Sequence, residues 1–236
     1  MKIRKSPVQL ASLVLCEAAA LVTLICMVKT GQQTRALTAA GTLLLVLLPE
    51  LVQCRCGCRF SLPMYLFCVV YALGPMIGQC WNIYYTVSWW DKLLHICGGV
   101  LFAIAGVYLF RYLAPENKHP LMPALFGLLF SVTVAVLWEF AEFGMDAFLG
   151  MDMQNDTVVT GFSSYLLADT LGETRTIENI TSVLINGEQL PVQGYVDIGL
   201  IDTMVDMLVA GAGALLTCLL LWLDGGKHPL IRTQEK

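Results

Sequence analysis

The sequence predicts an all-α polytopic membrane protein with six transmembrane helices and a small external β-hairpin insertion. Hydrophobic residues make up 57% of the 236 residues and charged residues only 14%, against about 25% charged residues in an ordinary soluble domain. The mean hydropathy is +0.69, and long apolar runs alternate with short polar patches, as expected when lipid surrounds most of the surface. A net charge of −4 without a basic stripe argues against nucleic-acid binding.

Six apolar stretches are long enough to cross a hydrocarbon core of about 30 Å. The first follows Lys2, Arg4 and Lys5, as a secretory signal would, but its apolar part is too long for a cleaved signal and contains Glu17. We therefore predict an uncleaved first helix, and we expect residues 1–236 to form a single transmembrane domain. The predicted spans are residues 7–28, 36–52, 60–81, 93–113, 121–147 and 198–223.

The basic residues predict the orientation, because Lys and Arg accumulate on the cytoplasmic side of a membrane. If the N-terminus is inside, ten basic residues fall in cytoplasmic segments and four fall outside. We therefore expect both termini in the cytoplasm. The inner set is Lys2, Arg4, Lys5, Arg55, Arg59, Arg111, Lys118, Lys227, Arg232 and Lys236; the outer set is Lys29, Arg35, Lys92 and Arg175.

The one long connection, residues 148–197, is predicted to be external and acidic. It contains seven acidic residues and a single basic residue, Arg175. Within it, residues 181–185 and 188–192 flank Asn186 and Gly187, the pair that best fits a type I′ turn. We expect a short β-hairpin there, acting as a lid or rim at the outer surface.

Ionisable residues recur within the fourth, fifth and sixth helices. Charges at membrane depth cost about 3 kcal/mol each on insertion scales, so they indicate function by default. Spacings of three or four residues place the members of each set on one helical face. The three sets are Asp91 and His95; Glu139, Glu142 and Asp146; and Asp202 and Asp206.

The predicted topology places all three sets in the outer half of the membrane. Glu139 lies roughly 12 Å below the end of its helix, and His95 and Asp206 lie about 6 to 12 Å down theirs. One shared site is therefore geometrically allowed. Asp91 and Asp146 lie so close to helix ends that each also suits the wet interface, where it would have no part in a site.

So many acids require protonation, water or bound cations to neutralise them in a low-dielectric setting. Mixed imidazole and carboxylate ligands favour Zn, Mn or Fe, whereas oxygen ligands alone favour Mg or Ca. The leading hypothesis is a divalent metal site in which Glu142 also acts as general base on water held by the metal. Its candidate ligands are Asp91, His95, Glu139, Glu142, Asp202 and Asp206.

In these segments the sequence resembles the YjdF-type bacterial inner-membrane proteins and, more distantly, the VanZ-like proteins. The resemblance implies a multi-pass protein of a bacterial plasma membrane, and it covers residues 91–223 best. It depends on Asp91-Lys92-x-x-His95 before Gly98-Gly99, on Trp138-Glu139-x-x-Glu142, on residues 147–150 followed by Gln154 and Asp156, and on Asp202-Thr203-x-x-Asp206-Met207 before Gly211 and Gly213.

Three functions remain open from the sequence. The first is a metal-dependent hydrolase or transferase that acts on a lipid-linked or small envelope substrate. The second is a proton- or cation-coupled transporter, although the sequence contains no convincing internal repeat of the kind common in such carriers. The third is a non-catalytic membrane scaffold whose acids are bridged by water.

Three alternating cysteines, Cys54, Cys56 and Cys58, fall in a predicted cytoplasmic loop. Such a run could bind a soft metal or respond to redox state, but it lacks a second cluster of ligands and the spacing of zinc sites. We expect a plain basic loop, without a disulfide in the reducing cytosol.

Overall fold

The computed structural model describes residues 6–225 and 230–233. Several basic residues that contribute to the predicted orientation lie outside the described residues: Lys2, Arg4, Lys5, Lys227 and Lys236. The chain forms two compact units, residues 1–135 with 209–236 and residues 136–208. The expectation of a single transmembrane domain stays a prediction.

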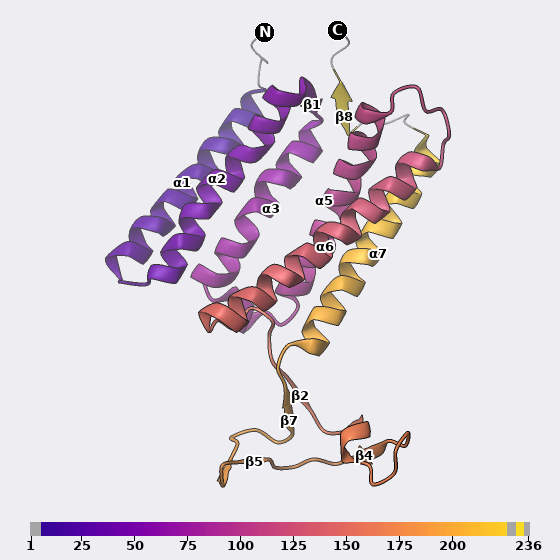
Figure 1. The fold of residues 1–236 in the computed structure, drawn as a ribbon. Helices are drawn as coiled ribbons and strands as arrows, with labels where there is room; N and C mark the ends of the chain where they lie inside the picture. Colours follow the sequence, from indigo (N-terminus) through magenta and orange to yellow (C-terminus); the bar gives the residue numbers. More distant parts are fainter. Residues whose placement is uncertain (1–5, 226–229, 234–236) are drawn as a thin grey trace. The chain divides into compact units, whose positions relative to one another are not determined.

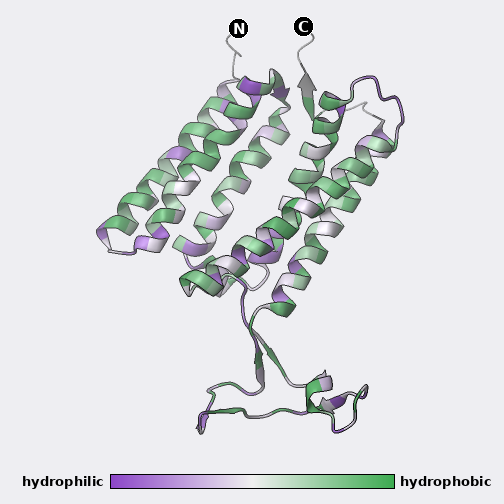
Figure 2. Ribbon diagram, viewed as in Figure 1, coloured by the Kyte–Doolittle hydropathy of each residue, from purple (hydrophilic) through white to green (hydrophobic). Residues whose placement is uncertain are grey.

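The six predicted spans are confirmed. Within the described residues, six helices are long and apolar enough to cross a membrane. Figure 2 shows hydrophobic residues along these helices and hydrophilic residues at the turn between the first two. The helices are α1 (Pro7–Lys29), α2 (Gln33–Cys56), α3 (Leu62–Cys80), α5 (Trp90–Leu113), α6 (Met122–Leu149) and α7 (Leu200–Asp224).

Local signals fix where several helices begin and end. At the start of α1, Ser6 Oγ accepts a hydrogen bond from the Gln9 amide and Gln9 Oε1 accepts one from the Ser6 amide, both at 3.1 Å, which is a capping box. Ser61 Oγ caps the start of α3 with a single hydrogen bond, which it accepts from the Met64 amide. Gly57 ends α2 in the left-handed conformation, with a φ of 59°.

Helices α1, α2 and α3 lie side by side in the first unit (Figure 1). Their shared core includes Leu13, Val46, Tyr65 and Val69, one or two residues from each helix. Tyr65 is fully buried, and its hydroxyl donates to Glu50 Oε1 at 2.8 Å. A residue of the apolar core thus also provides a hydrogen-bond donor for the one acidic residue on α2, Glu50.

Small residues let three helices of the first unit approach closely. A Cβ added at Gly99 of α5 would lie 2.1 Å from the carbonyl oxygen of Ala210 on α7, and one at Gly106 would lie 2.8 Å from Gly127 Cα on α6. Ser131 Oγ on α6 donates to the Gly99 carbonyl at 2.9 Å. These contacts fix the register of α5 against the adjoining parts of α6 and α7.

The predicted cysteine loop is instead a helix end followed by a strand. Helix α2 continues to Cys56, and β1 (Cys58–Phe60) pairs antiparallel with β8 (Ile231–Thr233). Gln53 Oε1 accepts a hydrogen bond from the Phe60 amide at 2.9 Å, which braces the turn. Partial burial, and then the neighbouring Cys56, raise the pKa of the Cys58 thiol.

The long connection in the second unit contains three antiparallel strand pairs, and Figure 1 shows β2 and β7 lying side by side. The predicted hairpin is confirmed: Asn186 and Gly187 have φ values of 53° and 88°, as a type I′ turn requires. Its strands are shorter than predicted. The pairs are β2 (Thr157–Val159) with β7 (Tyr195–Asp197), β3 (Phe162–Ser164) with β4 (Arg175–Ile177), and β5 (Leu184–Ile185) with β6 (Glu188–Gln189).

Candidate metal centre

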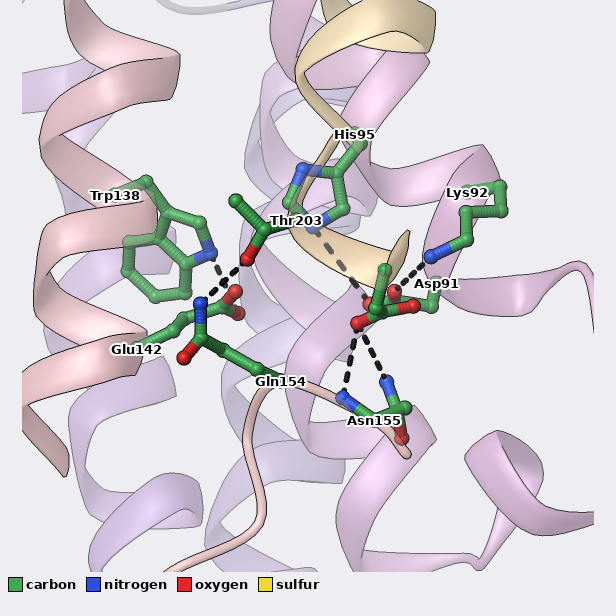
Figure 3. A network of polar contacts seen from close by, with 9 residues as sticks. Asp91, Lys92, His95, Trp138, Glu142, Gln154, Asn155 and Thr203 are labelled. Atoms are coloured by element: carbon green, nitrogen blue, oxygen red, sulfur yellow. Dashed lines mark hydrogen bonds and ion pairs between the residues drawn. The ribbon is translucent and has the colours of Figure 1, made fainter. Parts of the chain in front are cut away.

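In the first unit, Asp91 and His95 lie in the first two turns of α5. His95 Nε2 lies 3.8 Å from Asp91 Oδ1, and the His95 side chain is only 9% exposed. Lys92 Nζ donates to the other Asp91 oxygen at 3.2 Å. Figure 3 shows the side chains of Lys92 and His95 directed at the Asp91 carboxylate. The predicted spacing of four residues thus brings an imidazole and a carboxylate together on one helical face.

Contacts with α3 hold this part of α5 in place. Trp90 Nε1 donates to the Gly74 carbonyl at 3.3 Å. A Cβ added at Gly74 would overlap Leu94, and one added at Gly98 would lie 2.8 Å from the Tyr71 hydroxyl. The Asp91 and His95 pair is therefore carried on a closely packed helix rather than on a loop.

In the second unit, four buried carboxyl groups lie at the end of α6 and the start of α7. Glu139, Glu142, Asp202 and Asp206 are each at most 7% exposed. Residues 136–208 contain twelve acidic residues and one basic residue, Arg175, which is exposed on β4. Carboxyl groups buried in such acidic surroundings require protonation, water or bound cations to neutralise them.

Glu142 is hydrogen-bonded within its own helix. Trp138 Nε1 donates to Glu142 Oε1 at 2.9 Å, and Figure 3 shows the indole directed at the carboxylate. The two residues are four apart, so they lie on the same face of α6. A donor bonded to a carboxylate restricts its orientation.

Asp146 binds the loop that follows α6. Its Oδ1 accepts from the Met153 amide at 2.6 Å and its Oδ2 accepts from the Gln154 amide at 2.9 Å. Both carboxylate oxygens therefore hold the backbone of the connection. The sequence allowed two interpretations of Asp146, as a member of the site or as a residue at the wet interface. These hydrogen bonds give it a structural role.

Asp202 holds the next residue of the same loop. Its Oδ2 accepts from the Asn155 amide at 2.9 Å and from the Asn155 side chain at 3.3 Å. Gln154 Nε2 donates to Thr203 Oγ1, as Figure 3 shows. Residues 153–155 thus form a strap, tied to α6 by Asp146 and to α7 by Asp202 and Thr203.

The strap lies in a strongly negative region. The pKa of Asp152 is raised, first by partial burial and then by the carboxylates of Asp156, Asp146 and Asp202. Acidic residues on both sides of the connection, Asp146 and Asp202, thus act on Asp152 within the second unit.

Each unit thus brings together some of the residues that the sequence predicted. In the first unit, Asp91 and His95 adjoin. In the second unit, all four predicted carboxyl ligands are buried, and Asp202 also secures the strap. Sequence reasoning missed the roles of Asn155 and Thr203. Sequence reasoning also missed the contact between Trp138 and Glu142, although their spacing of four residues in one helix could have indicated it.

Comparison with known proteins identifies a family. A family model described as a predicted membrane protein (DUF2238) matches residues 11–225. No curated protein and no solved structure matches the chain. The YjdF-type resemblance agrees with this family, whereas the VanZ-like resemblance and a bacterial origin stay predictions. Because the match extends over most of the sequence, the chain belongs to the DUF2238 family of multi-span membrane proteins.

Proposed function

We propose that the protein binds a divalent metal between α5, α6 and α7 and uses it to hydrolyse or transfer a group on a lipid-linked or small envelope substrate. The observation that carries the proposal is the burial of four carboxyl groups, Glu139, Glu142, Asp202 and Asp206, in a unit with a single basic residue. The Asp91 and His95 pair supplies the remaining ligands.

The register of the helices in the first unit supports a shared site. Gly99 contacts Ala210, and Ser131 donates to the Gly99 carbonyl. His95 and Asp206 each lie one turn before Gly99 and Ala210, in helices α5 and α7. Glu139 lies about two turns beyond Ser131 in α6. Continuing each helix outward from the contact therefore leads to a candidate ligand within one or two turns.

The proposed ligands suit a metal ion that is intermediate between hard and soft. One imidazole with several carboxylates suits Zn, Mn or Fe better than Mg or Ca. When bound, such an ion would activate water and polarise a carbonyl or phosphoryl group. Glu142 would accept the proton that water loses on attacking the substrate and return it to the leaving group.

We also infer the orientation that this function needs. With both termini in the cytoplasm of a bacterial cell, α5 and α7 start at the outer face and α6 ends there. The described basic residues at the opposite ends of the helices, Arg55, Arg59, Arg111 and Lys118, support this orientation. The proposed site then opens toward the cell envelope.

Metal analysis of the purified full-length protein tests the proposal. We expect zinc, manganese or iron to co-purify with the wild-type chain and to be lost from a Glu139→Ala, Asp206→Ala double variant. Glu188→Ala, on the exposed hairpin, is the matched control and should retain the metal. Equal and negligible metal in all three proteins would contradict the proposal. Reduced melting temperature with unchanged metal content would indicate a scaffold role for the acids instead.

A further inference from the structure

Trp138 connects the outer surface of α6 to a buried acid. Its side chain is 46% exposed, whereas Glu142, one turn later in the helix, is 5% exposed. The hydrogen bond from Trp138 Nε1 to Glu142 Oε1 measures 2.9 Å. The exposed indole therefore reaches inward to a carboxylate that has almost no contact with solvent.

The chemistry of the indole limits what this contact can do. The Nε1 group is a donor only, so Trp138 cannot itself bind a cation. The bond uses one of the two oxygens of Glu142, and the rigid ring restricts the rotation of a side chain that otherwise has several rotamers. Its effect is to fix the direction of the Glu142 carboxylate.

We propose that Trp138 is a positioning residue, which orients Glu142 toward the bound metal through this hydrogen bond. The proposal rests on the metal site proposed above. Groups that are hydrogen-bonded to a metal-binding side chain affect metal affinity strongly. Their loss weakens metal binding by about 10- to 100-fold in known sites. Trp138 would act in this way although it is half-exposed on the surface of α6.

The first measurement is zinc affinity, by equilibrium dialysis of the full-length protein in detergent with elemental analysis. Trp138→Phe keeps an aromatic ring but removes the N–H donor, and we expect it to weaken zinc binding by about 10- to 100-fold. Trp222→Phe is the matched control, because Trp222 is 42% exposed and lies on α7. We expect its zinc affinity to equal that of the wild type.

The second measurement separates positioning from general stability. The emission of Trp138 is obtained by subtracting the Trp138→Phe spectrum from the wild-type spectrum. We expect zinc, which has no redox chemistry of its own, to shift this emission in the wild-type protein. In a Glu142→Gln background, the addition of zinc should leave the emission of Trp138 unchanged.

The outcomes distinguish the two proposals. If the wild-type protein binds zinc and Trp138→Phe binds it equally well, the positioning role is wrong and the metal site stands. If the wild-type protein binds no zinc, manganese or iron, the metal site is wrong and the positioning role falls with it. An unshifted Trp138 emission in a zinc-binding wild-type protein would also overturn the positioning role.

Discussion

Asp152 makes the stability of the second unit depend on pH. Burial and the nearby carboxylates of Asp156, Asp146 and Asp202 raise its pKa in the folded protein. A carboxyl group with a raised pKa stabilises the fold below its unfolded pKa, and this stability is lost as the pH rises through the folded pKa. Asp152→Asn should therefore increase the free energy of unfolding at neutral pH and have little effect in acid.

Unfolding of the two proteins at a series of pH values checks this prediction. Asp169→Asn, an exposed acid in the same connection, controls for the removal of one negative charge. If Asp152→Asn destabilises the protein at neutral pH, or matches Asp169→Asn throughout, the raised pKa of Asp152 has no consequence for stability.

Asp146 should determine how firmly the strap is held. Its two oxygens accept the amides of Met153 and Gln154, and removing such a charged acceptor costs about 1–3 kcal/mol. Asp146→Ala should lower the local opening free energy by this amount. Hydrogen exchange of peptides covering residues 148–156 would then become faster, and unchanged exchange would contradict the role.

Local spacing explains which site contacts the sequence could predict. Asp91 with His95, and Trp138 with Glu142, are four residues apart in one helix, so periodicity alone places each pair on a common face. The bond between Asn155 and Asp202 joins residues 47 apart. It depends on the path of the intervening connection, which no pattern in the sequence reveals.

At the scale of helices, the close approach of α5 and α7 at Gly99 predicts that a larger residue there destabilises the protein. A methyl group at Gly99 would meet the backbone of Ala210, which cannot move aside as a flexible side chain would. We expect Gly99→Ala to destabilise the protein by about 1–3 kcal/mol. Gly211→Ala is the matched control, because a Cβ there meets nothing within 4 Å.

Thermal unfolding in detergent would compare the two variants with the wild type. Gly211→Ala should be neutral or stabilising, by up to about 1 kcal/mol, because alanine favours helices over glycine. Equal melting temperatures for the two variants would mean that α5 and α7 do not approach as closely as the structure indicates.

The helices were predictable and most of the strands were not. Hydropathy located all six spans, but α2 extends from Gln33 to Cys56, beyond the predicted residues 36–52, because the helix continues at both ends through polar residues such as Arg35 and Gln53 that hydropathy does not assign to a span. The hairpin followed from Asn186 and Gly187, whose turn geometry is local. In contrast, β1 pairs with β8 across most of the chain, and strands of three residues carry too little pattern to be recognised.

At the scale of the whole molecule, the predicted topology has both termini on the same side of the membrane, because six spans are an even number. Reporter fusions that are active on only one side test this topology. We expect fusions after residue 236 and within residues 114–121 to report the cytoplasm, and fusions within the hairpin at residues 186–187 to report the outside. The same location for the hairpin and the C-terminus would contradict the topology and the outward-facing site.

The distribution of charge also belongs to this scale. The second unit contains twelve acidic residues and one basic residue, whereas the chain as a whole has a net charge of only −4. Composition alone revealed the acidic connection, but not that four carboxyl groups on the helices at either side of it, α6 and α7, are buried. That burial depends on packing between helices, and it is the observation from which the metal site is inferred.

X-ray absorption spectroscopy of the zinc-loaded, full-length protein tests the metal site most directly. We expect ligands at about 2.0–2.2 Å that are nitrogen and oxygen rather than sulfur. The scattering signature of an imidazole should be present in the wild type and lost in His95→Ala. A spectrum that is unchanged in His95→Ala, or one dominated by thiolate ligands, would contradict the proposed centre.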